Sequence, residues 1–101
     1  MRSERFKSLV EGNPENELFR FSLAQSLVRE DQWAEAEPHL RTCIEMKPDW
    51  MVAHIALGKA LIELGRDDEA KPILQTAHRL AVEQEHEDPE TELSTLLEKI
   101  N

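Results

Sequence analysis

The sequence repeats itself with a period of 34 residues. A shift by this period places Pro14 on Pro48 and superimposes a series of leucine, alanine, proline and polar positions. The matching pairs are Leu23 and Leu57, Leu27 and Leu61, Glu35 and Glu69, Ala36 and Ala70, Pro38 and Pro72, Leu40 and Leu74, and Thr42 and Thr76. A fixed period of about 20–50 residues is typical of stacked units that complete their apolar cores against one another. The repeat therefore predicts a function located on a surface and not in a catalytic cleft.

Within each copy the apolar residues recur at helical spacing, and no segment alternates as a strand would. The first copy predicts a helix that opens at Asn13-Pro14 and ends near Glu30-Asp31, followed by a helix that begins at Trp33. In the second copy Asp49 is the candidate cap of the first helix and Gly65 closes it. The second helix begins with the acidic residues 67–69 and is expected to run past Leu80.

Residue size and spacing in both copies resemble the tetratricopeptide repeat, over about Glu17 to Leu80. The second copy carries the pattern as Leu57-Gly58, Leu61, Leu64-Gly65, Glu69-Ala70, Leu74 and Ala77, and the first as Leu23-Ala24, Leu27, Trp33, Glu35-Ala36, Leu40, Cys43 and Pro48. The resemblance implies an all-α, right-handed α-solenoid of antiparallel helix pairs, with about six helices. The chain departs from the family at Arg20, His54 and Asp67, where aromatic residues are usual.

A chain of 101 residues is one domain of modest core, and two repeats alone would be marginally stable. We expect a capping helix over residues 2–12, repeats over residues 14–47 and 48–81, and a second capping helix over residues 88–101. Phe6, Leu9 and Val10 share one face of the first cap. In the second, Asp88-Pro89 supplies a helix start, and the apolar face consists of Leu93, Leu96, Leu97 and Ile100.

The net charge is −9, from 21 acidic and 12 basic residues. No basic patch is evident in the sequence, which argues against nucleic acid or an anionic membrane as partner. The six acids between Glu83 and Glu92 indicate a solvated face or a connector. No apolar run is long enough for a signal peptide or a membrane span, and the single cysteine is compatible with a reducing compartment. We therefore expect a cytoplasmic protein.

No motif proposes an enzyme, and we expect no cofactor and no metal. His39 and Cys43 are four residues apart, a spacing at which two ligands can share a metal. Cys43 corresponds to Ala77 of the other repeat, so its sulfur is expected to point inward while His39 faces solvent. The paired acids near the helix starts are interpreted as helix-start charges, and the three glycines as turn or packing residues.

In the tetratricopeptide family the first helix of each pair lines a concave groove that holds peptides or helices. The resemblance implies that the groove consists here of Leu18, Phe21, Gln25, Val28, Arg29, Val52, Ile55, Lys59 and Ile62, with Ser22, Ala56 and Glu63 beside them. The capping helices could instead cover part of this apolar stripe. Family members that grip a C-terminal carboxylate use basic and asparagine side chains, and this stripe offers only Arg29 and Lys59 and no asparagine.

Two functions remain open from the sequence. The first is a non-catalytic interaction module that binds a peptide or helix of another protein in the groove; the alternative is a self-association module that forms a homodimer through the groove or the end helices. Phe21 and Ile55 are corresponding positions that we expect to point into the groove. Glutamate at either position should then cost little stability, whereas Leu57→Glu should unfold the domain.

Overall fold

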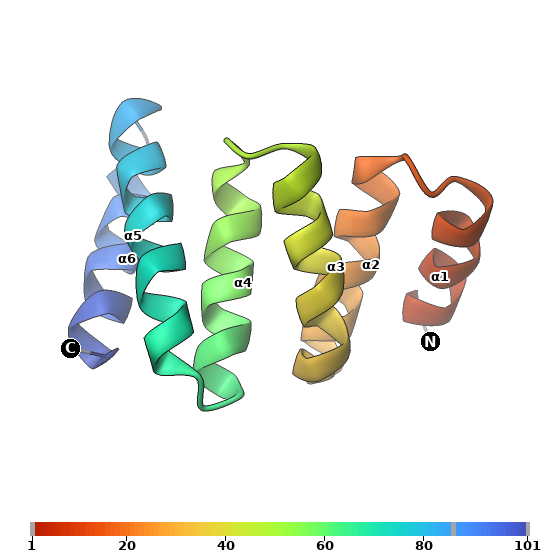
Figure 1. Ribbon diagram of the computed structural model, residues 1–101, viewed down its shortest axis with the longest axis horizontal. Coiled ribbons are helices and arrows are strands. Elements are labelled where there is room, and N and C mark those ends of the chain that lie inside the picture. Colours follow the sequence, from red (N-terminus) through yellow and green to blue (C-terminus); the bar gives the residue numbers. More distant parts are fainter. Residues whose placement is uncertain (1, 86, 101) are drawn as a thin grey trace.

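The computed structural model describes residues 2–85 and 87–100, of which residues 87–91 only as backbone. These residues form six helices joined by short turns (Figure 1). The helices are α1 (Arg2–Gly12), α2 (Glu17–Arg29), α3 (Trp33–Met46), α4 (Met51–Glu63), α5 (Asp67–Glu83) and α6 (Glu87–Ile100). The described residues contain no strand, so the prediction of an all-α fold is confirmed.

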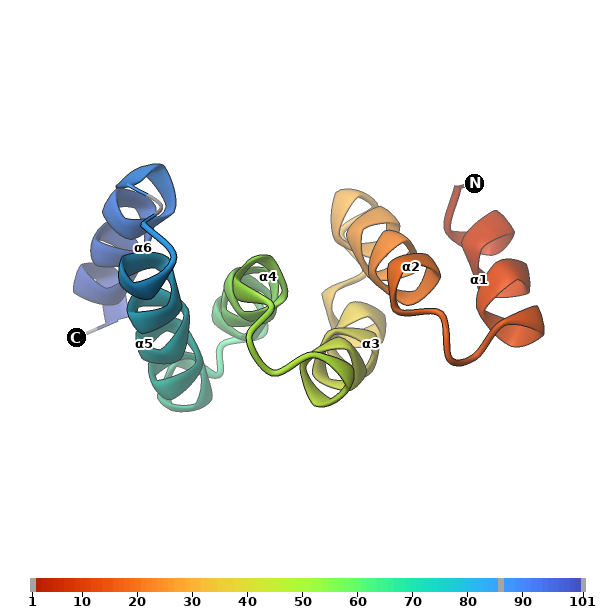
Figure 2. The same ribbon diagram turned by 90° about the horizontal axis from the view of Figure 1, so that it is seen from above.

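Each helix packs against the next along the chain, and α2 also touches α4. The result is a single row of antiparallel helices with overall dimensions of 38 × 28 × 20 Å. Seen from above, α3 and α5 lie along one side of the row and α2 and α6 along the other (Figure 2). We call the side of α3 and α5 the outer side and the side of α2 the inner side. This arrangement is an α-solenoid, as the period predicts.

The core runs between these two sides and is built from the repeated positions. Leu23, Leu27, Leu57 and Leu61 are at most 1% exposed, which confirms their predicted place in the core. The small residues at the close approaches are fully buried; they are Ala24, Ala36, Cys43, Ala70 and Ala77. Burial of one leucine-sized side chain stabilises the fold by about 1.5–3 kcal/mol. The repeated positions thus hold adjacent helices together.

Both end helices contribute to this core, as the marginal size of two repeats requires. In α1, Val10 is buried and Phe6 packs against the core. In α6, Leu93 is fully buried, and Leu96, Leu97 and Ile100 pack against the core around it. Helix α1 packs on α2 and α6 packs on α5, at the two ends of the row, and the capping role of both segments stays a prediction.

Two predicted helix starts are wrong. Helix α2 begins at Glu17 and not at Asn13-Pro14, because the Asn16 side chain accepts a hydrogen bond from the Phe19 amide at 3.0 Å and caps the helix there. Helix α4 is preceded by Trp50, with no side-chain cap, so Asp49 does not have the predicted role. The proposed cap at Asp88 lies outside the described side chains; the helix there begins at Glu87.

The repeat extends to the turns between paired helices. Asp31 and Gly65, 34 residues apart, both adopt positive φ, of 58° and 75°. In each turn the next amide donates to a helix carbonyl, from Gln32 to Leu27 and from Arg66 to Leu61, both at 2.8 Å. Glycine adopts this left-handed conformation at little cost, and aspartate tolerates it better than most residues. Equivalent turns therefore give both helix pairs the same geometry.

Candidate functional site

A groove on the inner side lies between α2 and α4 and has a volume of about 220 Å³. Helix α2 supplies one wall and α4 the other. The lining residues are Gln25, Val28, Arg29, Val52, Ile55, Ala56 and Lys59. We call these seven residues the α2–α4 groove. Six of the nine residues that the sequence predicted for a partner-binding surface therefore come together in one place.

The other three predicted residues lie outside the groove. Leu18 is 65% exposed, at the first turn of α2. Phe21 is half-buried, because its ring packs against Trp50 with centroids 4.6 Å apart and planes inclined by 42°. Ile62 is also half-buried and packs against the core. These side chains border or support the inner face without lining the groove.

Ile55 forms part of the groove and of the core at the same time. Its side chain is only 8% exposed and belongs to the main hydrophobic cluster. The expectation that Ile55 points away from the core is therefore wrong. The reason is the position of α4, which packs against α3 and α5 and also touches α2, so that little of its inner face remains open. Val52, one turn earlier, keeps 44% of its surface exposed.

Three residues of the groove are polar: Gln25, Arg29 and Lys59. Lys59 forms an ion pair with Glu92 of α6, which ties the groove wall to the end helix. Gln25 and Arg29 are on α2, and neither makes an ion pair or side-chain hydrogen bond with the described residues. No described residue of α1 or α6 lines the groove itself. The groove thus combines four apolar residues with two polar side chains that have no partner among the described residues.

A second hollow on the inner side lies between α1 and α2 and has a volume of about 520 Å³. Its lining residues are Arg2, Arg5, Phe6, Leu9, Ser22, Gln25, Ser26 and Arg29. We call this hollow the arginine pocket. Sequence reasoning missed it, because Arg29 is 24 positions or more from the other two arginines and only the packing of α1 on α2 brings them to one place. The spacing of Arg2 and Arg5, one helical turn apart, was the available signal.

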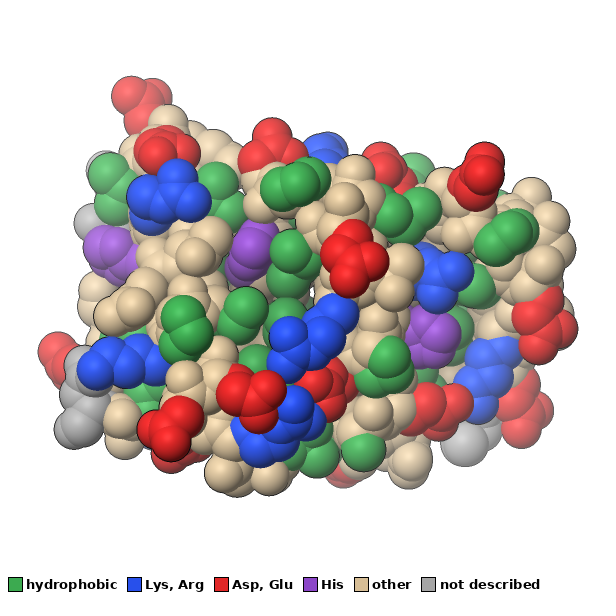
Figure 3. Space-filling model, in the orientation of Figure 1, with side chains coloured by type: hydrophobic (Ala, Val, Ile, Leu, Met, Phe, Trp, Pro, Cys, Tyr) green, Lys and Arg blue, Asp and Glu red, His purple; other side chains and the backbone are tan. Residues whose placement is uncertain are grey.

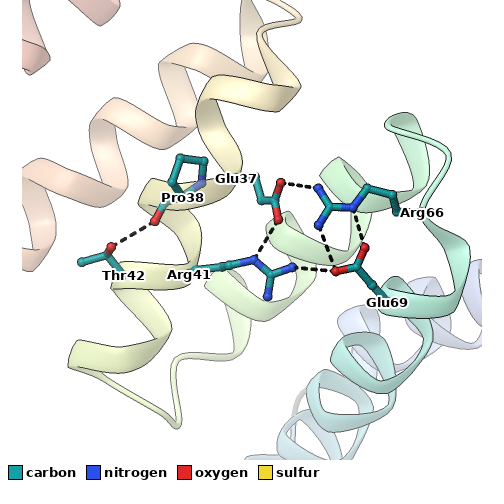
Figure 4. A network of polar contacts seen from close by, with 6 residues as sticks. All are labelled: Glu37, Pro38, Arg41, Thr42, Arg66 and Glu69. Carbon is teal, nitrogen blue, oxygen red and sulfur yellow. Dashed lines mark hydrogen bonds and ion pairs between the residues drawn. The ribbon is translucent and has the colours of Figure 1, made fainter.

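Four charged residues of the outer side are paired with one another: Glu37, Arg41, Arg66 and Glu69. Glu37 of α3 accepts hydrogen bonds from Arg41, at 2.8 Å, and from Arg66, which also binds Glu69 of α5 (Figure 4). The two guanidinium groups hold the pKa of the Glu37 carboxyl below its ordinary value. Figure 3 shows the outer side, where basic and acidic side chains lie next to one another. The network connects the two repeats, and its two carboxylates and two guanidinium groups balance one another.

His39 and Cys43, the two residues at metal-ligand spacing, differ in burial. Cys43 is fully buried, and burial raises the pKa of its thiol to about 11. His39 is half-buried, and Arg20 Nη1 lies 3.2 Å from its Nδ1. Burial and the Arg20 charge lower the pKa of the imidazole. No group of three or more potential ligands occurs among the described residues.

His54 is a packing residue. It is 5% exposed, and its Nε2 lies 2.8 Å from the Pro48 carbonyl oxygen. Since a carbonyl can only accept, this contact places the proton on Nε2. His54 thereby links α4 to the turn before it.

None of the described helices is both long and apolar enough to cross a membrane.

The chain is similar to known proteins in sequence and in fold. The family model described as tetratricopeptide repeat matches residues 27–100. A protein from Bordetella parapertussis, solved in solution, is 26% identical, with a TM-score of 0.82 over 97% of this chain and 85% of that one. No curated protein gives a significant sequence match.

Two further solved structures share the fold at 20% identity. The Yersinia enterocolitica type III secretion translocator chaperone SycD has a TM-score of 0.91, over 97% of this chain and 68% of that one. The TPR2B domain of yeast Sti1, solved as a complex with pHsp70, has a TM-score of 0.86, over 97% of this chain and 78% of that one. The helix row described above therefore recurs, nearly in full, in proteins with little sequence identity to this one.

Proposed function

The chain belongs to the tetratricopeptide repeat family, and from this premise we propose that it binds a peptide or helix of a partner protein in the α2–α4 groove. The fold supports a protein-interaction module as the general function. The observation that carries the specific proposal is the convergence of Val28 with Val52 and Ile55 on one groove, across two helices. A groove lined by apolar and polar residues together suits an anchor side chain of an incoming chain.

The size of the groove favours a protein ligand. Small-molecule sites usually have volumes of about 300–1,000 Å³ and enclose most of their ligand. The α2–α4 groove, at about 220 Å³, is smaller and has room for the side chains of a bound segment. Two proteins of the same fold are described by a protein partner: the Sti1 domain as a complex with pHsp70, and SycD as a translocator chaperone. We propose the same kind of ligand, a segment of another protein, for this chain.

The groove is poorly suited to grip a terminal carboxylate. Lys59 already has Glu92 as its ionic partner, and the lining contains no asparagine. Arg29 is the one cation of the lining without an ion pair among the described residues. Recognition in the groove then rests on apolar contact, and we propose a non-catalytic module that holds an internal segment of its partner. The protein would act as a cytoplasmic scaffold.

A matched pair of substitutions tests this proposal. Val52 is 44% exposed in the groove, and Val82 is 50% exposed on α5, outside it. Short random peptides displayed on phage are selected on the full chain, and the affinity of a selected peptide is measured for Val52→Glu and Val82→Glu. We expect Val52→Glu to weaken binding by about tenfold or more, because a charge faces the apolar ligand. Val82→Glu should leave affinity unchanged.

Three results would contradict the proposal. Binding that survives Val52→Glu would place the ligand elsewhere, and equal loss in both variants would indicate a general effect of added charge. Failure to select any peptide on the full chain would remove the evidence for an open groove. Sedimentation tests the homodimer alternative. If a second copy closes the groove, the apparent molecular mass of the wild type rises with protein concentration, whereas Val52→Glu stays a monomer.

A further inference from the structure

The arginine pocket gathers positive charge on a strongly acidic chain. Arg2, Arg5 and Arg29 line one hollow, while the whole chain carries a net charge of −9. All three side chains are exposed, and none forms an ion pair with another described residue. The cations Lys7, Lys59, Arg41, Arg66 and Arg79, by contrast, all have carboxylate partners. Unpaired guanidinium groups in one hollow suit an anionic ligand.

One carboxylate of the chain lies beside these arginines. Glu30 lines a smaller adjoining hollow of about 270 Å³ together with Arg2, Ser26 and Arg29. Its oxygens accept hydrogen bonds from Ser3, from the hydroxyl at 2.8 Å and from the backbone amide at 3.3 Å. Glu30 is therefore held by the start of α1, and it forms no ion pair with the arginines. One carboxylate against three guanidinium groups leaves the pocket positive.

The wall of the pocket also offers uncommitted neutral donors. Ser26 is only 3% exposed and lines both hollows, yet its hydroxyl makes no hydrogen bond to any described residue. Gln25 and Ser22, on the same face of α2, likewise make no side-chain hydrogen bond within the described part of the chain. A hydroxyl that lines a hollow and has no partner within the chain can donate to a bound carboxylate. These groups add directed hydrogen bonds to the charge of the arginines.

The arginine pocket and the α2–α4 groove adjoin one another. Gln25 and Arg29 line both, so a segment in the groove that extends across α2 toward α1 enters the pocket. We propose that the arginine pocket binds the aspartate or glutamate side chains of the partner segment whose apolar residue occupies the α2–α4 groove. This inference rests on the proposed function and specifies its ligand. The partner is an acidic segment with an adjacent apolar anchor.

The test uses a peptide selected from the random library on the full chain, with a second version in which every aspartate and glutamate is replaced by asparagine or glutamine. Affinities of both peptides are measured for the wild type and for the double variant Arg2→Gln with Arg5→Gln. These two residues are chosen because they line the pocket but not the groove. Lys71→Gln with Lys99→Gln is the matched control, since it removes two exposed cations, of α5 and α6, that form no ion pair with another described residue.

We expect selected peptides to contain acids on one side of an apolar residue. The amide version should bind the wild type about tenfold more weakly, as expected for the loss of a charge-assisted hydrogen bond. The arginine variant should bind the acidic peptide about tenfold more weakly and no longer distinguish the two versions. The control variant should behave as the wild type. Circular dichroism and melting confirm that the variants are folded.

The outcomes separate this inference from the proposed function. If Val52→Glu abolishes binding while the arginine variant and the amide peptide have no effect, the groove remains and the arginine pocket is excluded. If the arginine variant loses binding but Val52→Glu does not, both proposals fail, because the ligand does not use the groove. If the wild type self-associates and the arginine variant weakens this self-association, the occupant of the pocket is a second copy of the chain. The proposal of a partner segment would then be overturned.

Discussion

Gly58 of α4 faces Leu74 of α5 so closely that a Cβ atom built on the glycine would lie 2.6 Å from Leu74 Cγ. Leu74 is fully buried, so its side chain could not move aside without disturbing the core. We expect Gly58→Ala to destabilise the fold by up to about 2 kcal/mol, since overpacking costs about 1–3 kcal/mol and alanine regains about 1 kcal/mol of helix propensity. Chemical denaturation measures the difference.

Gly12→Ala is the matched control for this prediction. Gly12 ends α1, and an added Cβ would meet no atom within 4 Å. Alanine at this position should therefore leave stability unchanged or raise it slightly. A gain in stability for Gly58→Ala as large as that for Gly12→Ala would mean that α4 and α5 are less tightly packed than described.

Removal of the Leu93 side chain should destabilise the whole domain. Leu93 is fully buried although it belongs to the end helix α6, so Leu93→Ala leaves a cavity between α6 and the last repeat. Such changes cost about 2–5 kcal/mol, whereas Ser94→Ala at the exposed neighbouring position should stay within about 0.5 kcal/mol. Thermal melting of both variants compares them. If both variants melt with the wild type, α6 does not cap the row.

Ile55→Glu and Val52→Glu should differ sharply in stability. Ile55 is 8% exposed and belongs to the core, so glutamate there buries a charge and should unfold the domain. Val52 lines the same groove with 44% exposure, and glutamate there should be tolerated. Circular dichroism at increasing temperature distinguishes the two. A folded Ile55→Glu would show that the inner face of α4 is more open than the structure indicates.

The chain should lose stability as the pH falls through the range in which histidine titrates. The folded-state pKa of His39 lies below the ordinary value of 6.5, because of burial and the nearby Arg20. Between the two pKa values the unfolded chain binds a proton that the folded chain does not, so acidification favours unfolding in that window. We expect the free energy of unfolding to fall more steeply between about pH 7 and pH 5 in the wild type than in His39→Gln. If the free energies of unfolding of the wild type and His39→Gln depend on pH in parallel, protonation of His39 does not destabilise the folded chain.

The fold was predictable because its information is local and repeated. The spacing of Leu23, Leu27, Leu57 and Leu61 defines the helical faces, and the 34-residue period defines how the pairs stack. Helix starts are harder to predict, since Asn13 and Asn16 are both good caps; the Asn13 side chain donates to the Leu9 carbonyl at the end of α1, and Asn16 caps α2. The sequence pattern thus predicts which helices form, but it predicts the first residue of each helix less accurately.

The candidate site was predictable only in part, because it depends on distances between helices. Register placed Val52 and Ile55 on the inner face of α4, but the burial of Ile55 follows from how closely α2, α3 and α5 surround that helix. The arginine pocket needs α1 packed on α2, and no periodicity relates Arg5 to Arg29. Contacts between a capping segment and the repeats lie beyond what the period encodes.

The most direct test of the central claim is a map of the bound ligand on the protein. Amide chemical shifts of the full chain, labelled with ¹⁵N, are followed during titration with a selected peptide. The α2–α4 groove predicts the largest changes at Gln25, Val52 and Ala56 on the inner side. The competing location is the outer hollow of about 170 Å³, which Ile44 and Ile73 line. Changes centred on Ile44 and Ile73, with the inner side unaffected, would contradict the account.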